Sequence, residues 1–151
     1  MVVYYLDTSA LVKLYVREPG TDRMLRLAGL AEGHTLVVLA LARVEFRSAV
    51  RRRERAGDIP PESASELIGK LEDHWEKRYV IQPVTGAVME EATALLDRQP
   101  LRAYDAVQLA GCLVLRATLG VGVPWFVCSD PELLETARAE GVSVLDPVAS
   151  P

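Results

Sequence analysis

The chain has 151 residues, of which 50% are hydrophobic and 25% are charged, and its formal net charge is −4 at pH 7. These values exclude a disordered chain and fit a single domain, residues 1–151, that is long enough to bury a core. They also exclude a global positive field that would attract nucleic acid, so a polyanion would have to be bound locally.

Two cysteines, Cys112 and Cys128, lie far apart, and neither has a His or Cys at a spacing typical of zinc ligands. We therefore expect both to be reduced thiols in the core, which favours a cytoplasmic protein. The start of the chain lacks the basic flank and cleavage site of a secretory signal. The apolar stretch 109–127 is interrupted by Arg116 and Pro124, so the sequence predicts no membrane span.

The chain begins with a strand, a tight turn and a helix. Val2–Leu6 is an uninterrupted apolar and aromatic run, which is typical of a strand buried on both faces. Asp7 is the first charged residue after it, and Thr8 or Ser9 is expected to cap the helix that follows. Ligands of open α/β sheets bind beyond the carboxyl ends of the strands, where this turn places Asp7. The alternative role of Asp7 is to cap the helix itself.

Strands and helices alternate along the rest of the chain. Short apolar runs predict four more strands, at Leu36–Leu39, Tyr79–Gln82, Trp125–Cys128 and Val142–Leu145. Apolar residues at helical spacing predict helices over residues 21–33, 40–57, 61–75, 85–96, 104–117 and 131–141. In the fourth of these helices, the residues expected to face the core are Val88, Ala92, Leu95 and Leu96. Because parallel strands need crossover connections, the order predicts an α/β fold, a three-layer α/β/α sandwich with a central, mostly parallel sheet.

Four acidic residues are expected at one edge of this sheet. Asp7 and Asp130 each follow a strand, Asp105 lies in the first turn of a helix, and Glu45 lies near the start of a helix entered from a strand. Each could serve as a helix cap or stabilise a helix dipole. Four carboxylates together would repel strongly unless a cation stood between them. An oxygen-only site without His or Cys suits Mg²⁺ or Mn²⁺, which can activate water for attack on a phosphodiester.

The acidic segments resemble, in order and spacing, the motifs of PIN-domain nucleases, and the length and single-domain form are most similar to VapC-type toxins of toxin–antitoxin pairs. The segments that carry this resemblance are Tyr5–Leu11, Val44-Glu45, Tyr104–Ala110 and Cys128–Leu134. The resemblance implies a PIN-like fold and an endoribonuclease that depends on Mg²⁺ or Mn²⁺. It also implies a homodimer and a small VapB-like antitoxin that blocks the acidic pocket.

The resemblance also assigns roles to individual residues. Asp7 and Asp105 match the direct metal ligands of the family, and Glu45 and Asp130 match acids that act directly or through coordinated water. Ser9 matches a small hydroxyl residue near the pocket that binds water or phosphate, although capping of the first helix is an equal alternative.

One position departs from the family pattern. Relatives often have Ser or Thr just ahead of the helix that carries the glutamate, whereas this chain has Leu39 and Ala42. We therefore expect no hydroxyl contact with the pocket from this segment.

Arginines on the helix of residues 40–57 are candidate phosphate contacts. At 100° per residue, Arg52 returns to nearly the angle of the glutamate, Arg53 is the second choice, and Arg43 and Arg47 point to the far side. Arg102, just ahead of Asp105 in the chain, is another candidate. For all of them, a solvated surface position is the alternative.

The sequence therefore predicts a metal-dependent ribonuclease of the toxin type, with RNA and an antitoxin as partners. One alternative is a PIN-like module that binds RNA or a protein without hydrolysis. Another is a Mg²⁺-dependent phosphatase, because Asp7 also ends a first parallel strand. The phosphatase is disfavoured because Ser9 stands where haloacid-dehalogenase enzymes have a second Asp, and because no phosphate-binding Lys follows a later strand.

Overall fold

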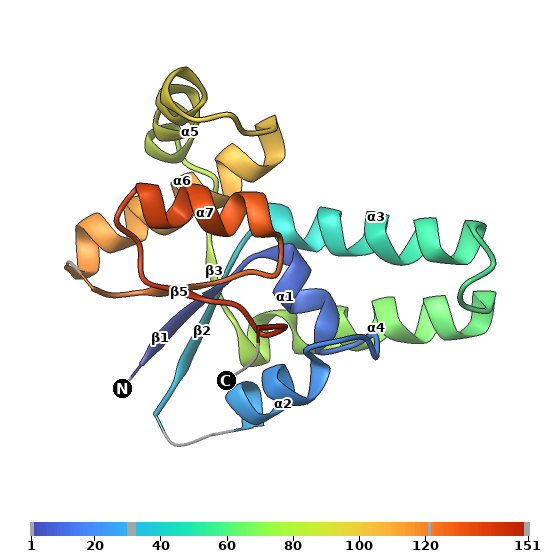
Figure 1. Ribbon diagram of the computed structural model, residues 1–151. Coiled ribbons are helices and arrows are strands. Elements are labelled where there is room, and N and C mark those ends of the chain that lie inside the picture. Colours follow the sequence, from blue (N-terminus) through green and yellow to red (C-terminus); the bar gives the residue numbers. More distant parts are fainter. Residues whose placement is uncertain (1, 30–32, 121, 150–151) are drawn as a thin grey trace.

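A sheet of five parallel strands in the order β3-β2-β1-β4-β5 forms the centre of the structure (Figure 1). The structure is a computed structural model that describes residues 2–29, 33–120 and 122–149. Within these ranges the elements are, in chain order, β1 (Val3–Leu6), α1 (Thr8–Lys13), α2 (Thr21–Gly29), β2 (Thr35–Leu39), α3 (Leu41–Arg55), α4 (Pro61–Arg78), β3 (Val80–Gln82), α5 (Gly86–Arg98), α6 (Ala103–Leu119), β4 (Trp125–Val127), α7 (Pro131–Ala139) and β5 (Val144–Leu145).

Helices cover both faces of the sheet. On β1, Tyr5 packs into a core formed with α5, α6 and α7, whereas the next residue, Leu6, packs into a second core formed with α1, α3 and α4. This alternation follows from the period of two in a strand, which places successive side chains on opposite faces. The predicted three-layer α/β/α sandwich is therefore confirmed, and the sheet is entirely parallel in the part of the chain described.

The central position of β1 determines where a site can form. Leu6 pairs with Val38 of β2 on one side and with Val127 of β4 on the other. The chain leaves the three strands at the same edge, and it enters α1, α3 and α7 there. The order of the strands reverses at β1, and in open α/β sheets a crevice forms at such a point.

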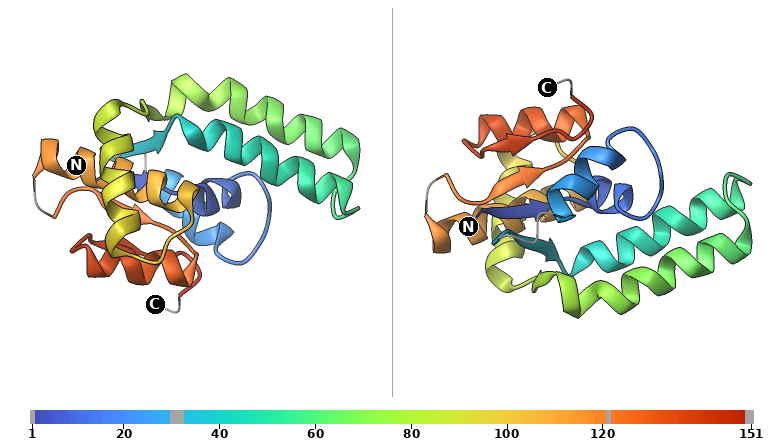
Figure 2. Two further views of the ribbon diagram at one scale, coloured as in Figure 1. Left: turned by 90° about the horizontal axis from the view of Figure 1, so that it is seen from above. Right: turned by 90° about the horizontal axis from the view of Figure 1, so that it is seen from below.

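Helices α3 and α4 form an antiparallel hairpin that extends beyond the sheet (Figure 2). The turn between them contains Gly57, whose φ of 82° is one that residues with a side chain rarely adopt. The apolar spacing on α4 predicts five residues that face the core; Leu67 is partly buried and the other four are buried: Ala64, Ile68, Leu71 and Trp75. The hairpin holds the N-terminal part of α3 against the sheet edge.

Two predictions about individual residues are wrong. Asp7 itself caps α1, so neither Thr8 nor Ser9 does, because the turn leaves the Asp7 carboxylate beside the amide of Ser9. Leu96 is 43% exposed rather than buried, because it lies at the edge of the buried face of α5, about 80° around the helix from Val88. The helix predicted over residues 21–33 is observed as α2 (Thr21–Gly29), and the prediction for residues 30–32 falls outside the described residues.

Helix α6 is the most deeply buried helix on its side of the sheet, with an unbroken buried run from Gln108 to Leu113. Both cysteines are buried and unpaired, as predicted, and one of them, Cys112, lies in this run. Among the described residues, no helix combines the length and the apolar character needed to cross a bilayer.

Gly111 allows α6 to approach β1 closely. A Cβ atom at this position would collide with the hydroxyl of Tyr5 and would lie 2.9 Å from Cδ1 of Leu39. Glycine in the middle of a helix costs roughly 0.5–1 kcal/mol relative to alanine, so the close packing on Tyr5 offsets this cost.

We predict that Gly111→Ala lowers the free energy of unfolding by about 1–3 kcal/mol, because both Tyr5 and Leu39 must shift. The matched control is Gly69→Ala on the exposed side of α4, where a Cβ atom meets nothing within 4 Å. That variant should instead gain roughly 0.5–1 kcal/mol from helix propensity. Urea denaturation of the three proteins measures both values, and a stabilised Gly111→Ala variant would contradict the packing described.

Candidate active site

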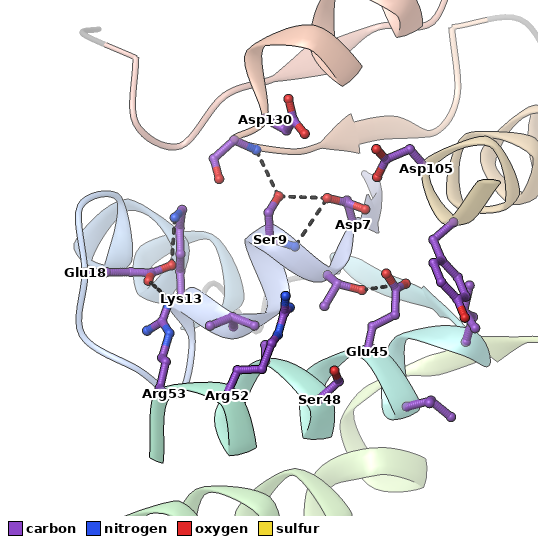
Figure 3. Close-up of a pocket in the computed structure, with 17 residues that line it drawn as sticks. Asp7, Ser9, Lys13, Glu18, Glu45, Ser48, Arg52, Arg53, Asp105 and Asp130 are labelled. Atoms are coloured by element: carbon purple, nitrogen blue, oxygen red, sulfur yellow. Dashed lines mark hydrogen bonds and ion pairs between the residues drawn. The ribbon is translucent and has the colours of Figure 1, made fainter. Parts of the chain in front are cut away.

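A cavity of about 530 Å³ opens at the sheet edge where β1, β2 and β4 end (Figure 3). Its walls come from α1, the loop after α1, α3, the start of α6 and the loop between β4 and α7. The polar residues that line it are Asp7, Thr8, Ser9, Lys13, Glu18, Glu45, Ser48, Arg52, Arg53, Tyr104, Asp105, Ser129 and Asp130. The structure therefore places all four predicted acids in one cavity, together with Ser9 and Arg52.

Asp7 lies at the centre of the cavity wall and is only 6% exposed. Its Oδ2 accepts hydrogen bonds from the backbone N–H and the side-chain hydroxyl of Ser9, at 3.3 and 2.8 Å. Burial raises the pKa of Asp7, and the two hydrogen bonds from Ser9 lower it in part. Asp7 therefore caps α1 and also presents a buried carboxylate to the cavity.

Ser9 connects the end of β1 with the loop that precedes α7. Its hydroxyl donates to Asp7 and accepts a hydrogen bond of 3.1 Å from the backbone N–H of Ser129. The neighbouring Asp130 caps α7, since its Oδ1 accepts from the backbone N–H groups of Glu132 and Leu133 at 3.0 and 3.4 Å. These bonds fix the distance between the first and the last acid of the motif set.

Glu45 is held by two donors that sequence reasoning did not identify. Its Oε1 accepts hydrogen bonds from the hydroxyl of Thr8, at 3.0 Å, and from the side-chain amide of Gln108, at 2.8 Å. Burial raises the pKa of Glu45, the bond from Gln108 lowers it, and the nearby Asp7 raises it further. The spacing of three residues between Asp105 and Gln108 is the signal that could have placed this amide on the same face of α6.

Asp105 shows the electrostatic consequence of gathering the acids. Burial raises its pKa to about 6, and the charges of Asp7 and Asp130 add to this effect. Arg102 opposes the rise only in part, and it lies outside the residues that line the cavity. The acidic wall therefore carries negative charge that the side chains around it do not neutralise.

This wall suits a hydrated hard cation. Among the described residues, no three His, Cys, Asp or Glu side chains are placed to bind one ion together. Mg²⁺ does not require such a cage, because it usually keeps several waters and uses one or two carboxylates. The repulsion that raises the pKa of Asp105 is the kind that a bound cation relieves. The oxygen donors present thus fit Mg²⁺ or Mn²⁺ better than a soft metal.

The opposite end of the cavity is basic, which sequence reasoning recognised only in Arg52 and Arg53. Lys13 is 6% exposed, and its Nζ lies 2.8 Å from Oε1 of Glu18, while Arg53 lies 2.6 Å from the other oxygen, Oε2. Burial raises the pKa of Glu18, but the hydrogen bonds from these two cations bring it below its usual value. The position of Lys13, four residues after Ser9 on α1, is the signal that could have revealed it.

Arg52 projects from α3 into the cavity and forms no ion pair with any of the described residues (Figure 3). In contrast, Arg43 and Arg47 contact Glu72 on α4, on the far side of α3 as predicted. Arg52 is therefore a cation in the cavity whose charge is available to a ligand.

Comparisons with known proteins show which proteins the chain resembles in sequence and in fold. The PIN domain family model matches residues 4–139. Ribonuclease VapC46 of Mycobacterium tuberculosis is 31% identical over 147 residues, which cover 97% of this chain and 99% of that protein. Two solved structures are similar in fold. VapC20 of Mycobacterium tuberculosis, described as a toxin that cleaves the sarcin–ricin loop, has a TM-score of 0.67 and 16% identity over 98% of this chain and 99% of that chain. A toxin–antitoxin complex from Klebsiella pneumoniae has a TM-score of 0.64 and 14% identity over 97% and 98%.

The raised pKa of Asp105 gives a prediction for stability against pH. Its folded-state pKa, about 6, exceeds the unfolded value near 4, so the folded chain binds more protons between these values and loses stability as pH rises through them. Asp105→Asn removes this penalty. We predict that this variant raises the free energy of unfolding by about 1 kcal/mol at pH 7.5, since solvent partly screens the Asp105 charge. Below about pH 4 it should not change the free energy of unfolding.

Urea denaturation with a chelator present, at several pH values between 4 and 8, measures this difference. The control is Asp97→Asn on the exposed side of α5, outside the cavity, which should change stability by less than about 0.5 kcal/mol at every pH. A gain for Asp105→Asn that is the same at pH 4 and pH 7.5 would show that charge is not its cause.

Proposed function

Because this chain belongs to the PIN domain family, we propose that it is an endoribonuclease that cleaves RNA phosphodiester bonds as the toxin of a type II toxin–antitoxin pair. The observation that carries this proposal is the convergence of Asp7, Glu45, Asp105 and Asp130 in one cavity at the carboxyl edge of the sheet. A relative that matches nearly the whole chain is named a ribonuclease, which supports the same activity.

The ion that we assign to the cavity is Mg²⁺, with Mn²⁺ as a substitute. Asp7 and Asp105 would bind it directly, and Glu45 and Asp130 would act directly or through water. When bound, the ion supplies Lewis-acid stabilisation of the phosphodiester and an activated water for in-line attack. The hydrogen bonds that already fix Asp7, Glu45 and Asp130 mean that little rearrangement is needed when RNA binds.

The basic end of the cavity would hold the RNA backbone. Arg52 has no acidic partner among the described residues, so a phosphate next to the cleaved bond would satisfy its charge. Lys13 and Arg53 support the same end, with Glu18 between them. Ser9 and Arg102 stay predicted contacts with RNA, the first inside the cavity and the second beyond its wall.

Two protein partners belong to this proposal. The first is a small VapB-like antitoxin that covers the acidic cavity, which a similar fold solved as a toxin–antitoxin complex supports. The second is another copy of this chain. Met89 and Leu96 lie seven residues apart on the same side of α5 and are 50% and 43% exposed, so they offer an apolar face for a homodimer. The toxin would act on RNA in the cytoplasm.

We predict that Asp7→Asn and Asp105→Asn each abolish RNA cleavage in Mg²⁺ while leaving the protein folded. Asparagine caps a helix as well as aspartate does, so α1 should survive the first change. A gel assay on a mixed single-stranded RNA measures cleavage. A chelator should stop cleavage by the unchanged protein, and added Mg²⁺ or Mn²⁺ should restore it.

The Asp97→Asn variant serves as the control and should cleave RNA as the unchanged protein does. Cleavage by both the Asp7→Asn and Asp105→Asn variants would refute the assigned site. Binding of RNA and Mn²⁺ without cleavage by the unchanged protein would favour the binding module. Hydrolysis of a simple phosphomonoester but not of RNA would favour the phosphatase.

Replacement of Arg52 tests the basic end of the cavity. We predict that Arg52→Ala raises KM for single-stranded RNA about 10-fold, changes kcat much less, and lowers the slope of log affinity against log salt by about 0.7, which corresponds to one phosphate contact. Arg55→Ala is the matched control, because Arg55 is exposed on the same helix outside the cavity. Equal effects of the two variants would mean that the helix attracts RNA only by its general charge.

A further inference from the structure

We propose that Gln108 is a positioning residue that fixes the Glu45 carboxylate so that one oxygen, Oε2, is left to act in the cavity. This inference rests on the proposed nuclease function and assigns the working atom of one of its acids. It concerns a side chain that lies behind the cavity wall and is not among the residues that line it.

Gln108 has all of its amide hydrogens engaged, although it is completely buried on α6. Its Nε2 donates to Oε1 of Glu45 at 2.8 Å and to Oγ1 of Thr8 at 3.0 Å, and its own Oε1 accepts from the hydroxyl of Tyr5 at 3.4 Å. A buried amide is costly unless it is hydrogen-bonded, so these three contacts hold the side chain in one orientation.

The hydrogen bonds among Gln108, Thr8 and Glu45 form a closed triangle in which each donor and each acceptor is determined. Because Gln108 donates to the Thr8 hydroxyl, the single proton of that hydroxyl is free to point at Glu45, where a donation of 3.0 Å is found. Both donors meet the same carboxylate oxygen, Oε1. Among the described residues none donates to Oε2, which leaves this oxygen for a ligand in the cavity.

The orientation of Gln108 is set from its other side by Tyr5. The Tyr5 hydroxyl lies against Gly111, one turn further along α6, in space that any larger residue would fill. The Tyr5 hydroxyl donates to the carbonyl end of the Gln108 amide, and the N–H end faces the Glu45 carboxylate, which can only accept. The positioning therefore starts in the core, between β1 and α6, and ends at the cavity.

A purely structural role does not require an amide here. An apolar side chain of similar volume would fill this buried position without needing any partner of its own, although the Tyr5 hydroxyl would lose its acceptor at a cost of about 1–3 kcal/mol. What an apolar side chain would lose is the second donor to Oε1 of Glu45. The carboxylate could then rotate about the single bond from Thr8 and exchange its two oxygens.

A double-mutant cycle tests the proposal, with Gln108→Leu, Glu45→Gln and the double variant. We expect Gln108→Leu to lower kcat on single-stranded RNA by about 10- to 100-fold, the usual effect of removing a partner that orients a ligand, with KM for RNA changed by less than about threefold. In the Glu45→Gln background the same change should cost less than about twofold further, since Gln108 acts only through Glu45.

Mn²⁺ affinity, measured by calorimetry without RNA, gives a readout that needs no turnover. Gln108→Leu should weaken Mn²⁺ binding by about 10-fold or more, and again not in the Glu45→Gln background. Gln99→Leu is the matched control, because Gln99 donates a similar 2.8 Å bond to Glu140 on the surface away from the cavity. This control should leave kcat and Mn²⁺ affinity unchanged.

Equal kcat and equal Mn²⁺ affinity in Gln108→Leu and the unchanged protein would overturn the proposal, as would equal losses in both backgrounds. If Gln108→Leu does not fold, Thr8→Val and Thr8→Ser replace it, and only the valine variant should lose activity and Mn²⁺ affinity. If the unchanged protein cleaves no RNA with either ion, the proposed function fails by itself, and the Mn²⁺ affinities still decide the role of Gln108.

Discussion

The central constraint on this structure is that the fold holds several carboxylates close together although their negative charges repel one another. Four carboxylates meet at the edge of the sheet because β1, β2 and β4 all end there. Their burial and mutual repulsion raise the pKa of Asp105 to about 6. Each of the other three is fixed by donors of its own: Asp7 by Ser9, Asp130 by the first turn of α7, and Glu45 by Thr8 and Gln108. The fold thus maintains a concentrated negative charge that favours a divalent cation.

Helix capping at this edge is compatible with the metal site that we propose, because the capping residues Asp7 and Asp130 both line the cavity. Asp7 caps α1 and Asp130 caps α7, so the simplest explanation of each residue in isolation is correct. The positive end of a helix dipole also makes a buried carboxylate less costly. A cap explains one acid at a time, however, and only the parallel order of the strands explains why the capped positions face one another.

Most of the fold and the acidic wall could be predicted from the sequence, because both follow from local patterns. Apolar runs ending in an acid place Asp7 and Asp130, and helical spacing places Arg52. The rest depends on contacts between distant segments. Spacing can place Gln108 and Lys13 on the correct faces of their helices, but their roles follow only from the packing of α1, α3 and α6, since their partners come from other segments. The family resemblance named the acids and Ser9, but not Thr8 and Gln108, which hold Glu45.

Helix α3 carries both an acid and a cation of the cavity, so the helix fixes the distance between these two side chains. Glu45 and Arg52 are seven residues apart, which is about 10 Å along a helix axis and nearly two full turns. In the function that we propose, the distance between the cleaved bond and the phosphate bound by Arg52 is therefore fixed by one rigid helix. An insertion of a single residue between them would swing the guanidinium by about 100° and separate the two tasks, whereas a loop of the same length could absorb it.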